Sequence, residues 1–194
     1  MKQLVFAFAA LGLAFSVAPA MSAAPPPGLP QPKILVIDRQ AILLRSSAGQ
    51  SILQQARSME QQLQKDFDSK VAALRAEGVK MQQQAAILSN EVKAQKMRDL
   101  DSRGKTIQGN AQNQLNEIKG GVLHAQEQLG QALGPILKGL MTERGANMLL
   151  DRNAIILSTV DVDVTGVVIQ RLNQKLTTVK VTPAPLPAGA QPAQ

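Results

Sequence analysis

KILVID (Lys33–Asp38) is the first of two short apolar stretches that bracket a long polar, helix-forming sequence. The second is MLLD (Met148–Asp151), which runs on into AIIL (Ala154–Leu157). Strands this far apart in the chain can share a sheet only if the helical sequence between them doubles back on itself. The pattern therefore predicts an α+β, mostly α fold, in which a small β-body carries one long antiparallel helical hairpin. Such a shape grips or spaces other molecules and leaves little room for an enclosed active site.

The first 23 residues are typical of a secretory signal peptide. Lys2 supplies a positive start, Leu4 to Ala18 is apolar, and small residues favour cleavage after Ala20 or Ala23. The apolar run is shorter than the ~20 residues that a membrane span needs, and no Cys is available for lipid attachment. We expect an exported, soluble chain. Because it contains no Cys, it needs a source of stability other than disulfides, and oligomerisation is the obvious one.

Charge and aromatic content limit the partners of the mature chain. Removing Lys2 with the signal leaves 20 basic and 14 acidic residues, a formal charge of +6 (20 − 14). Phe67 is then the only aromatic residue. Single-stranded nucleic acids are bound by stacking on aromatic side chains, so nucleic acid is not an expected partner. The positive charge suits acidic proteins or anionic lipid surfaces.

Composition divides the mature chain into four parts. Residues 24–32 are a Pro-rich linker, and residues 183–194 are a Pro/Ala-rich tail that we expect to be disordered. Residues 33–46 and 134–182 form the body with its short helices. Residues 47–133 form the helical-hairpin arm.

The arm is predicted from two apolar stripes. Ser47 is the expected cap of the first helix, with Gln50 at a capping-box spacing. The first stripe consists of Ile52, Ala56, Met59, Leu63, Phe67, Val71, Leu74, Gly78, Met81, Ala85 and Leu88. The second stripe consists of Met97, Leu100, Gly104, Ile107, Ala111, Leu115, Ile118, Val122, Ala125 and Leu129.

Each stripe advances in steps of four and three residues, with successive fours at one place only: around Phe67 in the first stripe and at Ala111 in the second. If these two irregularities face each other, the chain turns at Ser89-Asn90, and both residues favour turns. The seam is rich in Gly and Ala and should bend. Pro135 should end the second arm helix and begin a new one, Pro135 to Glu143, which stops near Gly145.

Two sets of arm residues are candidates for binding. A basic cluster follows the turn: Lys93, Lys96, Arg98, Arg103 and Lys105. It is either a solvated helix face or a cationic arm tip that attracts acidic partners. The apolar candidates, whose side chains can adapt to irregular surfaces, are Met59, Met81, Leu88 and Met97.

The body combines strands at 34–37 and 149–156, with Asn153 as a turn between the two later strands. Asp163 should cap a helix from Val164 to Leu176, and 178–182 should add an edge strand. This body is too small to be very stable alone, so we expect a homotrimer. The expected trimer contacts are Ile34, Val36, Leu149, Leu150, Ile155 and Ile156.

The sequence does not support an enzyme. The single His124 lies on a polar helix without partners at metal-ligand spacing. No strand precedes Gly120-Gly121, so a nucleotide-binding loop is not credible there. Asp161 and Asp163 are better explained by capping than by metal binding. We expect no catalytic residue, metal or cofactor.

Four short motifs in order resemble the Skp/OmpH family, whose members are periplasmic chaperones of outer-membrane proteins. The motifs are KILVID (33–38), LLRSSAG (43–49), LLDRNA (149–154), and DVT (163–165) with RLN (171–173). The resemblance implies a trimer whose strands build a shared body and whose arms enclose an unfolded outer-membrane protein without ATP. Gly166 departs from the family, which usually has an acidic residue there.

Two functions of different class follow. One is an ATP-independent periplasmic holdase that keeps unfolded outer-membrane β-barrel proteins from aggregating before membrane insertion. The other is a non-enzymatic adaptor whose hairpin docks onto one folded partner in an envelope assembly. Contact with anionic lipid or lipopolysaccharide is left open by the sequence.

Overall fold

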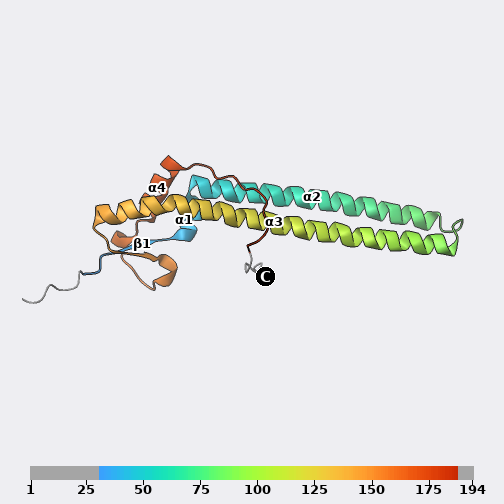
Figure 1. Ribbon diagram of the computed structural model, residues 1–194, viewed down its shortest axis with the longest axis horizontal. Coiled ribbons are helices and arrows are strands. Elements are labelled where there is room, and N and C mark those ends of the chain that lie inside the picture. The colour runs from blue at the N-terminus through green and yellow to red at the C-terminus, as the bar shows by residue number, and fades with distance from the viewer. Residues whose placement is uncertain (1–30, 188–194) are drawn as a thin grey trace, which may run out of the picture. The chain divides into compact units, whose positions relative to one another are not determined.

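A computed structural model describes residues 31–187. The predicted signal peptide, residues 24–30 of the predicted linker and residues 188–194 of the predicted tail lie outside the described residues. Figure 1 shows two long helices side by side, with the strands and the short helices gathered at one end. The elements are β1 (Ile34–Ile37), α1 (Arg39–Arg45), α2 (Ser47–Gln83), α3 (Asn90–Arg144), β2 (Met148–Asp151), the 3₁₀ turns η1 (Arg152–Ala154) and η2 (Val160–Val162), and α4 (Thr165–Lys175).

The two predicted apolar stretches pair directly, and they are parallel. Ile34 lies opposite Met148, and Ile37 lies opposite Asp151. On its other side β1 meets the start of α4, because the Val164 N–H donates to the Val36 carbonyl at 2.9 Å. β1 is therefore enclosed on both edges, whereas the described residues place no strand against the outer edge of β2.

The parallel pairing determines the lengths of the arm helices. The chain leaves β1 at Ile37 and must re-enter β2 beside the beginning of β1, so the returning helix has to pass the whole sheet. α3 has 55 residues and α2 has 37, a difference of 18 (55 − 37). At ~1.5 Å per residue this extra length is about 27 Å, and it covers the body.

Pro135 does not end α3, which corrects the predicted break. The helix continues to Arg144, and Gly145 then ends it in the left-handed conformation at φ 61°. Pro135 is exposed, and the residue before it, Gly134, has no Cβ to meet the proline ring. Interior proline costs about 3 kcal/mol. Full burial of Ile136 and Leu140 beside it offsets this cost, since each contributes about 1.5–3 kcal/mol.

Helix caps differ by one residue from those predicted. Ser46, which is fully buried, caps α2 in place of Ser47, and its hydroxyl accepts from the Gly49 N–H at 3.1 Å. α4 begins at Thr165 after Val164, while Asp163 accepts from the Thr165 N–H at 2.9 Å. Asp163 thus accepts a hydrogen bond at the N-terminus of α4, as predicted, but it stands one residue before the N-cap position.

The segment AIIL (154–157) is not a strand, and this prediction was wrong. Residues 152–154 form a 3₁₀ turn, Ile156 is fully exposed and Leu157 is nearly so. A strand needs a partner to satisfy its backbone groups, and the described part of this chain offers none beside it. The apolar content that suggested a strand is instead displayed on the surface of the body.

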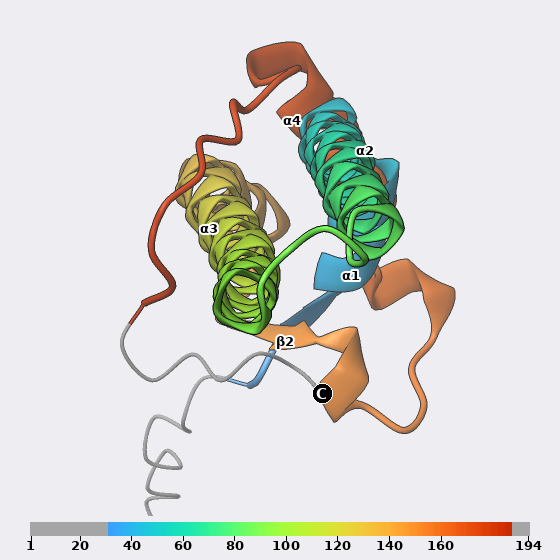
Figure 2. The same ribbon diagram turned by 90° about the vertical axis from the view of Figure 1, so that its right-hand side faces the viewer.

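The chain after α4 also differs from the prediction. Residues 178–182 form no strand, and residues 183–187, expected to belong to a disordered tail, lie against the helices. Val179 and Val181 are buried in the core, and the Ala184 N–H donates to the Glu117 carbonyl at 2.9 Å. In Figure 1 this extended segment leaves α4, runs beside α2 and then crosses α3, and Figure 2 shows it on the outer side of α3.

One core joins the body to the base of the arm. It contains residues from β1, from every helix and from the extended segment after α4. Its most completely buried large side chains are Ile42, Ile52, Leu140, Leu172, Val36, Val168 and Val181. An ion pair between Arg171 and Glu143, at 2.7 Å, fastens α4 to the end of α3 at the surface.

We expect Ser46→Ala to lower the free energy of unfolding by about 1–2 kcal/mol, because it removes a helix cap and leaves the buried Gly49 N–H without its partner. Urea unfolding at fixed protein concentration measures the loss. Ser47→Ala is the matched control and should change stability by no more than about 0.5 kcal/mol. An equal loss in both variants would contradict the assignment of Ser46 as the cap.

Candidate functional site at the arm tip

The apolar stripes of α2 and α3 face each other along the arm. Gly104 lies against the Leu74 side chain, and Phe67 and Ala111 line the same cavity. Residue numbers fall along one helix as they rise along the other, so the helices run in opposite directions, as Figure 1 also shows. The half-buried stripe residues include three of the four apolar binding candidates: Met59, Met81 and Leu88.

The seam loosens with distance from the body. Ala56 and Ile118 are buried at its base, whereas Leu63 and Leu115 further out are half-buried. A cavity of about 430 Å³ opens between the helices beside Phe67. On the α3 side its lining includes the small Ala111, which leaves this space unfilled. Phe67, the only aromatic residue among residues 31–187, is therefore incompletely packed in the middle of the arm.

The tip carries exposed apolar side chains. Met97, the fourth apolar candidate, is 60% exposed, Ile87 in the turn is 84% exposed, and Val79 is 52% exposed. Val92 is also exposed. Sequence analysis missed all of these but Met97, because they stand off the stripes. The signal that could have found them is that apolar residues outside a two-helix seam have nothing to pack against.

The turn itself is built by capping. α2 ends at Gln83, and α3 begins at Asn90 after Ser89, whose hydroxyl accepts from the Val92 N–H at 3.3 Å. The chain therefore folds back over Gln84–Ser89. Of the two predicted turn residues, Ser89 ends this loop and caps α3, whereas Asn90 is already the first residue of the helix. This loop presents Ile87 to solvent.

The predicted basic cluster divides into two groups. Arg103 reaches across the seam to both carboxylate oxygens of Glu77, one of them at 2.9 Å, and also lies 3.7 Å from Asp99. Lys105 pairs with Asp101 at 2.8 Å on its own helix. Among residues 31–187, no ion pair involves the three cations nearest the turn: Lys93, Lys96 and Arg98.

Lys96 has a further cationic neighbour. It lines a cavity of about 220 Å³ with Lys80 of α2, and Met81 and Leu100 supply apolar walls. Two carboxylates, Glu77 and Asp99, line the same cavity. Cations that form no ion pair within residues 31–187 thus lie near exposed apolar surface at the tip, although the charge of Lys96 also helps to lower the pKa of Glu77. That combination suits segments in which apolar and acidic residues alternate.

The hydrogen bond between Glu77 of α2 and Arg103 of α3 shifts the pKa values of both residues. The hydrogen bond from Arg103 holds the pKa of the Glu77 carboxyl below its ordinary value, and the same bond raises the pKa of Arg103. Asp101 likewise raises the pKa of Lys105, chiefly through its hydrogen bond. Arg103 and Lys105 therefore form ion pairs with carboxylates of this chain.

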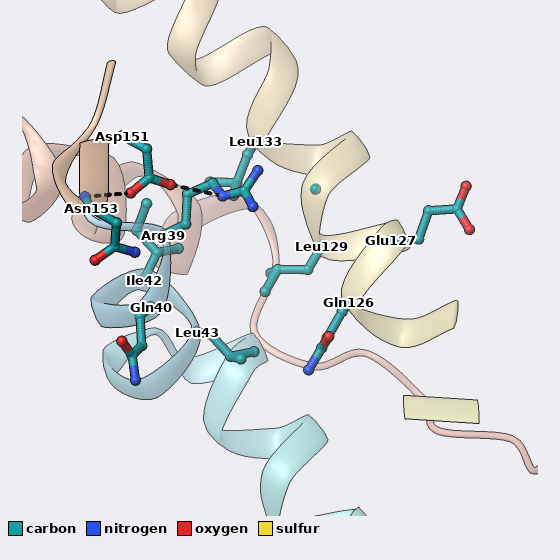
Figure 3. Close-up of a pocket in the computed structure, with 11 residues that line it drawn as sticks. Arg39, Gln40, Ile42, Leu43, Gln126, Glu127, Leu129, Leu133, Asp151 and Asn153 are labelled. Carbon is teal, nitrogen blue, oxygen red and sulfur yellow. Dashed lines mark hydrogen bonds and ion pairs between the residues drawn. The ribbon is translucent and has the colours of Figure 1, made fainter. Parts of the chain in front are cut away.

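A second hollow lies on the body, between α1 and α3. Figure 3 shows Ile42, Leu129 and Leu133 at its apolar side and the Arg39–Asp151 ion pair, 3.0 Å long, at its rim. Its volume is about 480 Å³. Nothing in it pairs a nucleophile with a base, and the described residues hold no group of three or more metal-binding side chains.

The predicted trimer residues are placed unequally. Val36 is buried inside this chain and has no surface to offer a partner. Ile34, Leu149, Leu150 and Ile155 are partly buried, and Ile156 is fully exposed. The exposed apolar residues of the body also include three that the sequence prediction did not name: Met148, Leu157 and Val160.

Neither His124 nor the hydropathy of the helices points to another kind of site. His124 is exposed, with its Nδ1 3.8 Å from Glu127. Of the helices that the structure describes, none is both long and apolar enough to cross a membrane. The fold and the site thus define a protein with a small body and one long two-helix arm, whose tip is apolar and cationic.

Comparison with known proteins identifies the family. The model of the family described as outer membrane protein (OmpH-like) matches residues 33–172. The chain belongs to the OmpH-like family. Comparison with curated proteins gives no match. The fold is shared with a crystal structure from Caulobacter crescentus CB15, described as a candidate OmpH-like outer membrane chaperone, with a TM-score of 0.74 and 18% identity. The similarity covers 82% of this chain and 94% of that one.

The Glu77–Arg103 pair makes a prediction about pH. Because the pKa of Glu77 is lowered in the folded chain, the pair should stabilise the arm above the ordinary value of 4.5 and lose this contribution as pH falls through the lowered value. NMR titration of the carboxyl should show the low pKa, and Arg103→Ala should raise it. Arg98→Ala is the control and should leave it low. A Glu77 pKa that is unchanged by Arg103→Ala would contradict the pairing.

Proposed function

We propose that this chain is an ATP-independent periplasmic holdase that binds unfolded outer-membrane β-barrel proteins and prevents their aggregation before insertion. The observation that carries the proposal is the tip, where Ile87 and Met97 are exposed near Lys93, Lys96 and Arg98, which form no ion pair in the described part of the chain. Membership of the OmpH-like family and the fold shared with the Caulobacter protein support it.

The tip has the physical properties that a holdase needs. Unfolded barrel strands alternate apolar and polar residues, so scattered apolar contacts bind them better than one deep pocket. Methionine suits this purpose because its side chain adapts to irregular surfaces. The cations attract acidic segments over a distance set by the ionic strength.

A direct test is to dilute a urea-unfolded barrel protein into buffer with and without the chain and to follow light scattering. A holdase should suppress aggregation at near-stoichiometric amounts without ATP. The other candidate, an adaptor, should bind one folded partner and leave aggregation unchanged. Failure to suppress aggregation of any of several barrel proteins would overturn the holdase proposal.

The basic tip should act mainly on the rate of capture. Replacing Lys93, Lys96 and Arg98 with Gln should slow association by on the order of tenfold at low salt, with a smaller change in release. Stopped-flow association with a labelled, unfolded barrel protein measures both rates.

The matched control replaces Lys65, Lys70 and Arg75 in the middle of α2 with Gln. This variant has the same change in charge, away from the tip, and should capture clients at nearly the parent rate. If both variants are equally slow, net charge alone is responsible. If neither is slow, the tip cations are only a solvated face.

We also propose that the functional unit is a homotrimer assembled through the body. The outer edge of β2 has no partner strand among the described residues, and an unpaired edge favours association. Ile156, Leu157 and Val160 add a patch of exposed apolar surface nearby in the chain. Burial of such surface is the main driving force for association.

Sedimentation equilibrium at micromolar concentration should therefore give three times the monomer mass. Ile156→Asp should shift the population to monomers, because it would bury an unpaired charge in the contact. Val79→Asp, an equal change at an exposed position of the arm, is the control and should leave the trimer intact. A parent chain that sediments as a stable monomer would refute the trimer.

A further inference from the structure

The extended segment after α4, residues 177–187, lies beyond the part of the chain that the family model matches. Its side chains alternate between inside and outside. Val179 and Val181 are buried in the core, while Lys180 and Thr182 are exposed. The segment is therefore held along one face in an extended conformation, without a strand beside it.

On α2, the side chain of Gln55 takes the place of a partner strand. Its amide nitrogen donates to the Val179 carbonyl at 2.7 Å, and its oxygen accepts from the Val181 N–H at 3.0 Å. The same nitrogen lies 3.0 Å from the Ser51 hydroxyl, which keeps the amide in place. One side chain thus satisfies two backbone groups of the segment.

On α3, the contact depends on two glycines. A Cβ at Gly121 would lie 2.3 Å from the Thr182 carbonyl oxygen, and one at Gly120 would lie 2.1 Å from that of Ala184. No side chain fits at these distances, so the segment crosses α3 directly on its backbone. The hydrogen bond from the Ala184 N–H to the Glu117 carbonyl fixes the crossing.

These anchors lie where the packing between the two arm helices changes from buried to half-buried. Gln55 and Gly121 are close in sequence to Ala56 and Ile118, which are buried, whereas Met59 and Leu115, the next positions toward the tip, are only half-buried. The segment therefore connects the two helices at the last point where their own packing is tight.

We propose that residues 177–187 form a clasp that holds α2 and α3 together at the base of the arm, and that release of the clasp lets the helices separate further out. The inference is independent of the proposed chaperone function, because it concerns only the spacing of the two helices. The clasp gives this chain a means of adjusting its arm that the matched family region does not contain.

The test uses Gly121→Ala in the full chain, since alanine favours the helix but excludes the clasp. Hydrogen exchange at the Val181 and Ala184 amides should become at least tenfold faster. Spin labels on Ser69→Cys and Asn113→Cys, introduced into a chain without natural Cys, should show a broader and longer distance distribution. Gln55→Leu, which removes the other anchor, should give the same two changes.

Gly109→Ala on the same helix is the matched control, because a Cβ there meets nothing within 4 Å, and it should change neither measurement. Unchanged exchange in both clasp variants would show that the segment is not held by these anchors. Faster exchange without any change in the distance distribution would show that the segment only covers the helices. Either result would overturn the proposal.

Discussion

The parallel pairing of β1 and β2 is the constraint on which the rest of the structure depends. A parallel strand can be reached only by a crossover that returns to the starting end of the first strand. Here the crossover is the entire arm, and the return helix is longer than the outgoing one. That extra length brings Leu133, Ile136 and Leu140 onto the body, where they supply much of its core. The sheet, the arm and the core therefore form together.

The seam is buried at its base and only half-buried from the middle of the arm to the turn, while several side chains of the tip are exposed; these form the candidate binding surface. At the base the seam residues are buried, in the middle they are half-buried around the Phe67 cavity, and at the tip Ile87 and Met97 are largely in water. Exposed apolar side chains are a liability unless they bind something. In the proposed function, the nearby cations favour encounter with acidic chains.

Much of the secondary structure could be predicted from local patterns. The two paired strands, the apolar stripes and the helix end at Gly145 follow from periodicity and from glycine's left-handed conformation. Three features depended on distant contacts and were missed. Pro135 remains helical because its neighbours are buried, the segment after α4 is ordered by Gln55 and two glycines, and AIIL (154–157) has no strand beside it.

The candidate site was predicted less completely than the fold. Lys93, Lys96 and Arg98 stand unpaired near the turn, but Arg103 holds the helices together through Glu77, which lies 26 residues away in sequence. Charge alone cannot distinguish a free cation from a paired one. The exposed apolar residues of the tip were missed for the related reason that exposure is decided by the partner helix.

The central claim is that unfolded clients contact the arm tip. A photo-crosslinking residue placed at Ile87 or Met97 tests it most directly, with a third variant at Leu44, an exposed apolar position on α1. We expect strong crosslinks to a urea-unfolded barrel protein from both tip positions, few from Leu44, and none to the same protein folded in detergent. Crosslinks from Leu44 alone, or equal crosslinks to folded and unfolded protein, would contradict it.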